Sequence, residues 1–395
     1  MNTQPLFYDE PSTDSCAARV LGLRPVTGGL GVILDRSPFY PEGGGQPCDL
    51  GTLAGLPLRF VGYEGDDIVH VVADTAEARS ALEPGQTATC VLDRARRRDH
   101  SEQHTAQHLL SATVLRLLGG PTTSFHLGEQ YSSIDVDLPA MDRADADAVE
   151  DAVLDVIRED YPIVTHVCPP EDPASFPLRR KPPEGEAVIR ILEIDGIDYT
   201  PCAGTHLASA GRIGLFRILR TEKYKGMTRV YFVAGGRAFA DYRALADGAR
   251  KAAAVLGVAE GDHAAAAATL SDKAREMELK LRQALDAASA AEAARLAAVA
   301  PELGLLSARA QDVAGAMRLA KALASAGRVA LVRSDAEPKC VAAGPDGSLD
   351  IGAALKPLCL ARGGKGGGGP SLFQAAFPDQ ASLDRFTADA ESALS

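Results

Sequence analysis

Short hydrophobic runs separated by glycine and proline make up the first part of the chain. Segments such as GLGVILD and DIVHVVAD are rich in β-branched residues and bounded by turn-forming residues, which is typical of short strands. Between the early strands lies SPFYPEGGGQPCDLG, in which Gly43, Gly44 and Gly45 precede Gln46. This pattern predicts a small all-β unit over residues 1–95.

The hydrophobic spacing changes from strand-like to helical at Asp99, which stands three residues before Glu102 as in a helix-capping pair. Leucine and valine then recur every three or four residues until a pair of glycines. A strand-like SSIDVDL, an amphipathic helix over residues 143–159 and a second strand, VIRILEID, follow. GLFRILRTEKYKGMTRVYFVAG predicts a hairpin that turns at its KG pair. We predict an α+β domain over residues 96–237.

Two further segments complete the chain. Residues 238–303 are rich in alanine, leucine and charged residues, with one break at Gly257–Gly261, which predicts long helices or an antiparallel coiled coil. In residues 304–395 strand-like segments alternate with helical ones, and the run Gly363–Gly369 predicts a glycine-rich loop in a small α/β domain. The expected fold class is therefore α+β and multi-domain.

Composition limits the class of protein. The 395 residues are 46% hydrophobic, enough to bury several cores without disulfide bonds. No run of 18 apolar residues occurs, and the N-terminal segment lacks the basic and apolar regions of a secretory signal. We therefore expect no membrane association and a cytoplasmic location. There the seven cysteines stay reduced, and their thiols are available to bind metal.

The net charge of −12 argues against a nucleic-acid partner, but the basic residues are segregated. From Gly211 to Arg237, a stretch that includes the predicted hairpin, there are one acid, Glu222, and seven basic residues: Arg212, Arg217, Arg220, Lys223, Lys225, Arg229 and Arg237. A second basic run consists of Arg94, Arg96, Arg97 and Arg98. Such runs are typical either of a phosphate-binding face or of an ordinary solvated surface.

Two pairs of metal-binding residue types share the same spacing. His104 and His108, in HTAQH, stand four apart on a predicted helix, so both imidazoles project from one face. Cys202 and His206, in PCAGTH, repeat that spacing after a predicted strand. Three imidazoles and one thiolate suit zinc rather than a hard, oxygen-preferring cation. We predict one Zn²⁺ per chain, with His100 in a secondary role.

The residues between the first two histidines exclude one class of zinc enzyme. A zinc protease places glutamate in HExxH as its general base, whereas Thr105, Ala106 and Gln107 fill those positions here. An isolated HxxxH also arises by chance on amphipathic helices. The later CxxxH strengthens the metal interpretation, but it does not name a substrate.

HTAQHLL followed by CAGTH resembles the zinc-binding editing domain shared by alanyl-tRNA synthetases and the free-standing AlaX alanyl-tRNA editing proteins; threonyl-tRNA synthetases carry a related pair. SPFYPEGGGQ, TTSFHLGEQYSSIDVDL and the hairpin segment look like other parts of the alanyl branch, in the same order. GGKGGGGPSLFQAAF is similar to the glycine-rich end of alanyl-tRNA synthetases. The resemblance covers nearly the whole chain.

The resemblance implies a domain for each segment: a glycine-rich β-barrel over 1–95, a zinc-dependent editing domain over 96–237, a helical linker or dimerisation segment over 238–303, and a glycine-rich C-terminal domain over 304–395. An alanyl-tRNA synthetase has several hundred residues of aminoacylation domain before the barrel. We therefore expect a trans-editing enzyme of the long AlaX type that does not charge tRNA. Its substrate would be alanine tRNA carrying serine or glycine.

The resemblance also assigns roles to single residues. It points to the TTSFH segment, with Thr122, Thr123 and His126, for recognition of the serine hydroxyl. Apart from the resemblance, the glycines before Gln46 permit close backbone approach by a phosphate or by the acceptor end of the tRNA, or else they form only a tight turn. From the segregated basic charge rather than from the resemblance, we expect these residues of the hairpin to contact the tRNA backbone: Arg217, Arg220, Lys223, Lys225 and Arg229. Lys365 and its glycine run would contact tRNA or support a homodimer.

Two other functions fit the same residues. One is a zinc hydrolase of small esters or amides unrelated to tRNA, which would have no need of the basic hairpin. The other is a non-catalytic tRNA-binding module in which zinc is a structural staple. Four protein ligands favour a closed site, but zinc would activate water if His206 were exchangeable. Deacylation of mischarged tRNA separates these possibilities.

Overall fold

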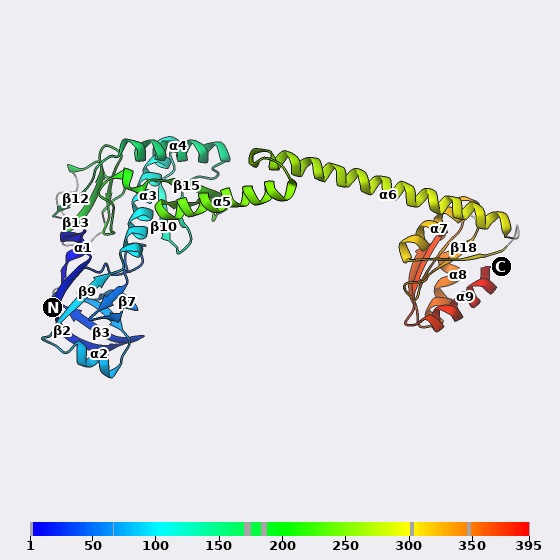
Figure 1. Ribbon diagram of the computed structural model, residues 1–395, viewed down its shortest axis with the longest axis horizontal. Coiled ribbons are helices and arrows are strands. Elements are labelled where there is room, and N and C mark those ends of the chain that lie inside the picture. The colour runs from blue at the N-terminus through cyan, green and yellow to red at the C-terminus, as the bar shows by residue number, and fades with distance from the viewer. Residues whose placement is uncertain are drawn as a thin grey trace. The chain divides into compact units, whose positions relative to one another are not determined.

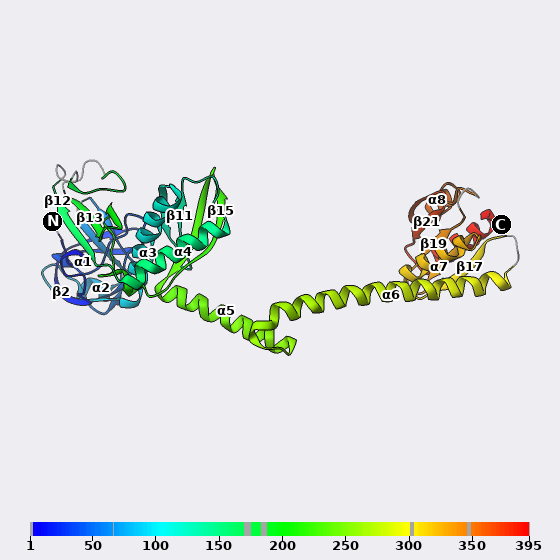
Figure 2. The same ribbon diagram turned by 90° about the horizontal axis from the view of Figure 1, so that it is seen from above.

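The computed structural model describes residues 3–65, 67–169, 175–182, 188–300, 304–345 and 349–394. Their contacts divide the chain into two compact units, Met1–Arg250 and Lys251–Ser395. Figures 1 and 2 show that helices and sheets occur in both units, so the mixed α+β, multi-domain class predicted from the sequence is confirmed. Within the described part of the chain, no helix is long and apolar enough to cross a membrane.

The first unit begins with an antiparallel sheet of seven strands in the order β6-β5-β9-β2-β3-β8-β7. The strands are β2 (Ser15–Val26), β3 (Gly29–Leu34), β5 (Gly51–Leu53), β6 (Leu56–Pro57), β7 (Phe60–Glu64), β8 (Asp67–Val72) and β9 (Thr87–Leu92). Beside it lie a short parallel pair and two short helices, β1 (Gln4–Pro5), β4 (Arg36–Ser37), α1 (Leu6–Asp9) and α2 (Ala76–Ala81). One cluster of buried residues, including Leu30, Val32 and Leu53, forms the core of this part.

The closed β-barrel expected for residues 1–95 is wrong for the residues that the structure describes. The edge strands β6 and β7 do not pair with each other, so the sheet is open. β6 is only two residues long and ends in Pro57, which has no N–H to donate. The ladder therefore stops where a barrel would have to close.

Helix α3 (Arg94–Leu118) follows the sheet and starts five residues earlier than the sequence predicted. The side chain of Asp93, not that of Asp99, caps it by accepting from the Arg96 N–H, and Gly119 ends it in a left-handed conformation. Every residue from His100 to Val114 is buried, because α3 packs against helix α4 and several strands. This burial on all sides places HTAQH inside the protein.

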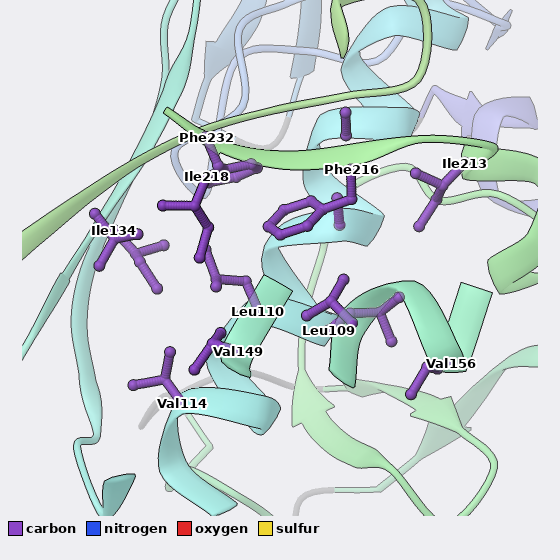
Figure 3. Packing of buried hydrophobic residues seen from close by; sticks show 14 of the residues in the cluster. Leu109, Leu110, Val114, Ile134, Val149, Val156, Ile213, Phe216, Ile218 and Phe232 are labelled. Carbon is purple, nitrogen blue, oxygen red and sulfur yellow. The ribbon is translucent and has the colours of Figure 1, made fainter. Parts of the chain in front are cut away.

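The rest of the first unit surrounds α3. One sheet has the order β10-β11-β16-β15 and a second the order β12-β13-β14, all antiparallel. The bounds are β10 (Thr122–Leu127), β11 (Ser132–Val136), β15 (Phe216–Tyr224), β16 (Met227–Ala234), β12 (Ile163–Cys168), β13 (Ile189–Ile194), β14 (Asp198–Pro201), α4 (Arg143–Glu159) and the short 3₁₀ helix η2 (Ala210–Ile213). Figure 3 shows Leu109 and Leu110 of α3, Val149 of α4 and Phe216 and Ile218 of β15 gathered in one core.

Helix α5 (Gly235–Leu256) begins in the first unit and ends in the second, and a break at Gly257 separates it from η3 (Glu260–Asp262) and the long helix α6 (His263–Val299). The second unit also holds a five-stranded sheet in the order β17-β18-β19-β21-β20. The other bounds are β17 (Leu306–Ala310), β18 (Ala330–Ser334), β19 (Lys339–Ala343), β20 (Lys365–Gly369), β21 (Leu372–Ala376), α7 (Val313–Ser325), α8 (Ile351–Ala361) and α9 (Gln380–Leu394).

The glycine-rich run near the C-terminus is a strand rather than the predicted loop. Residues Lys365–Gly369 form the edge strand β20, paired with β21. A Cβ atom at Gly368 would lie 2.0 Å from the Leu372 carbonyl oxygen, so glycine is needed for the two backbones to approach this closely. Separate hydrophobic clusters over 7–92, 106–234 and 293–394 are compatible with the expected domain boundaries, which stay predictions.

Candidate metal centre

The two predicted ligand pairs come together inside the first unit. His104 and His108 lie one turn apart on α3, and Cys202 and His206 lie in the loop that follows β14. One potential ligand atom from each residue lies within 4.8 Å of the others. This set of three imidazoles and one thiol comes from two segments nearly a hundred residues apart in sequence and forms a cluster that could hold a metal ion.

Neighbouring side chains orient two of the imidazoles. His104 Nδ1 is 2.9 Å from Gln46 Oε1, and His108 Nδ1 is 2.9 Å from Asp198 Oδ2. Each acceptor takes the Nδ1 proton, which leaves the Nε2 lone pair available to the cluster. Metal-binding histidines are commonly held by such a second hydrogen bond.

Several donor atoms of the cluster have no other partner. Among the described residues, His108 Nε2 and both ring nitrogens of His206 are buried without a hydrogen bond. Buried polar atoms in proteins nearly always have a hydrogen-bond partner, so these unpaired nitrogen atoms indicate that the cluster binds a ligand such as a metal ion. The chemistry of the donors, with nitrogen and sulfur only, fits zinc.

The electrostatics of the cluster favour the metal-binding forms of Cys202 and His206. Burial alone would raise the pKa of the Cys202 thiol, but His104, His206 and His108 together lower it well below its usual value. Burial lowers the pKa of His206 to about 4, which keeps this imidazole neutral at pH 7. A thiolate and neutral imidazoles are the forms that bind metal.

The glycine within CAGTH lies where a side chain cannot fit. A Cβ atom at Gly204 would lie 2.2 Å from His104 Cε1 and 2.9 Å from Gln46 Oε1. The Cys202–His206 loop can therefore pass this close to the ring of His104 only with glycine at that position.

A small cavity of about 100 Å³ borders the cluster. His104, His108 and Cys202 line it together with Gly44, Gln107, Thr122, Thr123, Ser124, Phe125, Arg179, Arg180, Thr200 and Ala203. Pockets for drug-sized ligands are roughly 300–1,000 Å³, so this cavity suits only a small group. Most of its lining side chains are polar.

The structure brings two of the three residues predicted from TTSFH to this cavity. The Thr122 hydroxyl donates to Ser111 Oγ at 2.7 Å, and the Thr123 hydroxyl donates to the Asp135 carbonyl oxygen at 3.1 Å. His126 is exposed on β10 and does not line the cavity. Its neighbour Phe125 faces the cluster instead, stacked on His104 with ring centroids 5.1 Å apart, because successive strand residues point to opposite sides.

Gln46 lies behind His104 and is almost completely buried. Its Oε1 accepts from the Thr205 N–H at 3.1 Å, and its Nε2 donates to Thr205 Oγ1 at 2.9 Å. The preceding glycines form a tight turn in which Gly44 and Gly45 have positive φ, closed by backbone hydrogen bonds between Gly43 and Gln46. The turn presents Gln46 to both His104 and the Cys202–His206 loop.

Sequence reasoning missed three charged residues at the site. Arg179 and Arg180 line the cavity, and Arg179 donates two hydrogen bonds to Asp198. Although burial favours the protonated carboxyl, hydrogen bonds from His108 and Arg179 lower the pKa of Asp198 to about 2. An aspartate at the start of the strand before CxxxH was the available signal for this partner.

The predicted tRNA-binding residues differ in how they are engaged. Arg217 forms an ion pair with Asp241, and Arg229 forms a bidentate pair with Asp135. The guanidinium of Arg220, although exposed, lies over the ring of Tyr231 at 3.7 Å. The remaining three, Lys223, Lys225 and Lys365, are exposed, and Lys365 belongs to the second unit.

Comparisons with known proteins agree with this site. The family model described as "Threonyl and Alanyl tRNA synthetase second additional domain" matches residues 189–231, which include Cys202 and His206. The alanyl-tRNA editing protein Aarsd1 of Danio rerio is 39% identical over 212 residues, 53% of this chain and 50% of the relative. The alanyl-tRNA editing protein AlaX-L of Pyrococcus horikoshii is 32% identical over 250 residues, 59% of this chain and 58% of the relative.

A longer relative matches the same part of the chain. The alanine–tRNA ligase of Methanothermobacter thermautotrophicus is 32% identical over 243 residues, which are 60% of this chain and 27% of that enzyme. The chain thus spans about half the length of the curated editing proteins that it matches. The resemblance to alanyl-tRNA editing proteins inferred from the sequence motifs is confirmed over this matched portion of the chain.

Proposed function

We propose that this chain removes wrongly attached serine or glycine from alanine tRNA by hydrolysing the ester bond. One zinc ion would be held by His104, His108, Cys202 and His206. The observation that carries the proposal is this cluster beside a small polar cavity, in a chain similar to alanyl-tRNA editing proteins. A protein acting on aminoacyl-tRNA would work in the cytoplasm, where translation takes place.

The proposed substrate follows from the limits of amino-acid recognition. A synthetase pocket built for alanine cannot exclude glycine by size and rejects serine poorly, since one small group changes binding by only about 1–3 kcal/mol. A second site that hydrolyses the wrong product supplies the missing accuracy. The cavity beside the cluster, about 100 Å³, has the size for such a small acyl group.

The reaction consumes one water and leaves free amino acid and the ribose hydroxyl of the tRNA. When bound, zinc in such a site polarises a carbonyl oxygen or lowers the pKa of a coordinated water. Gln46 and Asp198 support this by holding His104 and His108 in orientation. Arg180 donates to the Pro201 carbonyl oxygen and lines the cavity, so its cation would stabilise negative charge on the ester oxygen.

We assign recognition of the serine hydroxyl to Thr122 in particular. Its hydroxyl proton is engaged with Ser111, which leaves its oxygen able to accept from the hydroxyl of a seryl group. Alanine offers only a methyl group there. A buried polar atom left unpaired costs about 1–3 kcal/mol, roughly tenfold to a hundredfold in preference.

Two surfaces would bind larger partners. The exposed Lys223 and Lys225, together with Arg220, would contact the phosphate backbone of the tRNA. Helix α6 would pair with α6 of a second copy, because Leu270, Met277 and Leu281 are exposed by 57%, 70% and 60% and fall on one heptad seam.

Deacylation by the purified chain tests the function. Without ATP, it should release serine or glycine from mischarged alanine tRNA and spare alanyl-tRNA, and Cys202→Ala should abolish the release. Cys16→Ala is the matched control, because Cys16 is also half-buried but lies on β2 away from the cluster. Equal hydrolysis of seryl- and alanyl-tRNA, or none, would exclude editing.

A non-catalytic tRNA-binding module remains the second candidate, because a complete set of four protein ligands is typical of structural zinc. That candidate predicts tRNA binding without deacylation and unfolding when zinc is removed. Retention of the fold with loss of deacylation, after zinc is removed with a chelator, would favour the enzyme.

A further inference from the structure

A second and larger cavity in the first unit lies against the other part of the metal-binding loop. Its volume is about 470 Å³, and it shares no lining residue with the cavity beside the cluster. Gly204, Thr205, His206 and Leu207 form one wall. The start of α3, strands β12 and β13, η2 and the segment around Tyr8 form the others. We call this cavity the arginine groove.

The groove is lined by one carboxylate and five guanidinium groups. The carboxylate is Asp14, and the guanidinium groups belong to Arg94, Arg97, Arg98, Arg190 and Arg212. Arg94 pairs with Asp14 and Arg97 with the buried Asp49, so these two charges are balanced. Arg98, Arg190 and Arg212 form no ion pair among the described residues, although Glu102, Asp9 and Asp160 lie near enough to interact with them electrostatically. Their three guanidinium groups therefore surround one cavity without a directly bonded carboxylate.

Arg190 is the most constrained of the three. Its guanidinium carbon lies 3.5 Å from the centre of the Tyr8 ring, which fixes the position of the side chain. Its Nε atom is buried and donates to no acceptor in the described residues. Burial lowers the pKa of Arg190 and outweighs the opposing effect of nearby groups such as Tyr8 and Asp9, which is the direction expected of a partly desolvated cation.

Hydroxyl groups complete the lining. Ser12, Ser101, Thr165 and Thr205 all border the groove. Ser101 and Thr205 are 3.0 Å apart through their hydroxyl oxygens, and Thr205 is bonded in turn to Gln46. The guanidinium group of arginine can donate two parallel hydrogen bonds to the oxygen atoms of one phosphate group. Proteins commonly bind phosphate with such arginines together with hydroxyl groups.

We propose that the arginine groove binds backbone phosphates of the RNA substrate through Arg98, Arg190 and Arg212. The proposal rests on the proposed function, which brings an RNA to the loop that carries Cys202 and His206. The three cations come from α3, β13 and η2 and surround one cavity, whereas Arg217 and Arg229 of the predicted hairpin are already paired with acids. The groove thus offers more arginines outside a direct ion pair than the hairpin does.

Salt dependence of binding is the direct test. Binding of uncharged alanine tRNA to the full chain is measured by fluorescence anisotropy between about 50 and 200 mM salt. Arg98→Ala and Arg212→Ala should each weaken binding and lower the slope of log K against log salt by about 0.7–0.9, the value for one lost phosphate contact. Arg190→Gln should do the same, and its zinc content and thermal unfolding show whether loss of the stack on Tyr8 has disturbed the fold.

Arg116→Ala is the matched control. Arg116 is equally exposed and is also on α3, but it borders a different surface, beside Asp151, Asp155 and Glu159. The Arg116→Ala substitution removes the same charge as the groove variants and should leave the slope of log K against log salt unchanged. A wild-type slope in the Arg98→Ala, Arg212→Ala double variant would overturn the proposal, and a reduced slope in Lys223→Ala, Lys225→Ala alone would move the contact to the hairpin.

Two further outcomes distinguish the source of the phosphate and the fate of the proposed function. If inorganic pyrophosphate binds the wild-type chain and not the double variant, while RNA binding is the same in both, the groove is a small-anion site and the RNA assignment is wrong. Deacylation with an unchanged slope would refute the groove and leave the function standing. A lowered slope without deacylation would support the groove and refute the proposed function.

Discussion

The Asp198 carboxylate accepts hydrogen bonds from two basic side chains, His108 and Arg179, and from the Thr200 hydroxyl. One carboxylate oxygen lies 2.9 Å from His108 Nδ1, and Arg179 donates to both oxygens from the other side. The ion pair with Arg179 fixes the carboxylate, and the carboxylate fixes the imidazole. This chain of contacts gives His108 an orientation that the helix alone would not impose.

Replacement of Asp198 by asparagine should therefore weaken zinc binding without removing a ligand. Asparagine keeps the size of the side chain but loses its charge, so its bonds to His108 and Arg179 weaken. We expect a loss of zinc affinity of about 10–100-fold, measured by competition with a chromogenic chelator. Asp195→Asn, the same change at an exposed position three residues earlier, should have no effect. Equal affinities in the two variants would contradict the role of Asp198.

The adjacent threonines of β10 allow a matched comparison of hydroxyl function. Thr122→Val should reduce the preference for seryl- over alanyl-tRNA by roughly tenfold or more, because the acceptor for the serine hydroxyl is removed. Thr123→Val should change it less, since the Thr123 side chain is exposed, where water competes for its oxygen, whereas Thr122 is half-buried. Rates of deacylation on the two substrates give the answer. A larger effect at Thr123 would reverse the assignment.

Local spacing was sufficient to predict His104, His108, Cys202 and His206 as one set, because i, i+4 pairs place side chains together. It was insufficient for Asp198 and Arg179, which reach the site only through the pairing of β13 with β14 and the path of the preceding segment. The family resemblance, rather than spacing, placed His126 at the site, where the bulge and alternation of β10 bring Phe125 instead.

Helix α3 shows where element prediction fails for a physical reason. Its first turns contain the run Arg94 to Arg98, so the hydrophobic spacing begins only later and the start was predicted at Asp99. In the structure Arg97 is buried and donates to Asp49. This ion pair allows the first turn of the helix to be buried although its residues are polar. The residue that signals the true start of the helix is Asp93, a capping aspartate six residues before Asp99.

A buried histidine should make the seven-stranded sheet sensitive to acid. His70 on β8 lies 2.7 Å from Ser37 Oγ and 3.1 Å from the Val32 carbonyl oxygen, and complete burial lowers its pKa from 6.5 to about 4. Between these two values the unfolded chain binds more protons than the folded chain. The stabilisation is therefore present above pH 6.5 and falls as the pH drops toward 4, by about 3 kcal/mol in total.

Chemical denaturation at several pH values checks this expectation. The free energy of unfolding of the wild type should fall more steeply between pH 6.5 and 4 than that of His70→Gln, which keeps a hydrogen-bonding side chain without the titration. Parallel curves for the two proteins would show that His70 does not contribute.

The seam on α6 gives a prediction for the helix as an element. Leu270, Met277 and Leu281 recur with the spacing of d and a positions, whereas Leu279 lies on the opposite side. Leu281→Glu should convert a dimer into a monomer in light scattering, and Leu279→Glu should not. A wild-type chain that is monomeric at every concentration would exclude this pairing.

At the scale of the molecule, two compact units with separate cores should unfold separately. Removal of zinc should lower the transition of the first unit only, because the cluster lies within it. Leu323→Ala, in the core of the second unit, should lower the other transition and cost about 2–5 kcal/mol. Differential scanning calorimetry with and without chelator resolves the two. A single transition that responds to both changes would contradict independent units.

Most of the architecture was predictable because hydrophobic periodicity and glycine breaks are local properties of the sequence. The helical segment after residue 238, the break at Gly257 and the hairpin turn at Lys225 are of this kind. Closure of the first sheet was not predictable, since it depends on whether strands distant in sequence pair at their edges. The glycine run after Gly363 was ambiguous for the same reason, because only its pairing with β21 makes it a strand.

The hydrogen bonds of Gln46 restrict how far this chain can be shortened without disturbing the candidate metal centre. Gln46 belongs to the segment within the seven-stranded sheet, yet it contacts both His104 on α3 and Thr205 in the metal-binding loop. A chain that began after the sheet would retain every metal ligand and still lack the acceptor that sets the tautomer of His104. A shortened version that keeps the cluster must therefore supply a substitute acceptor for His104 Nδ1.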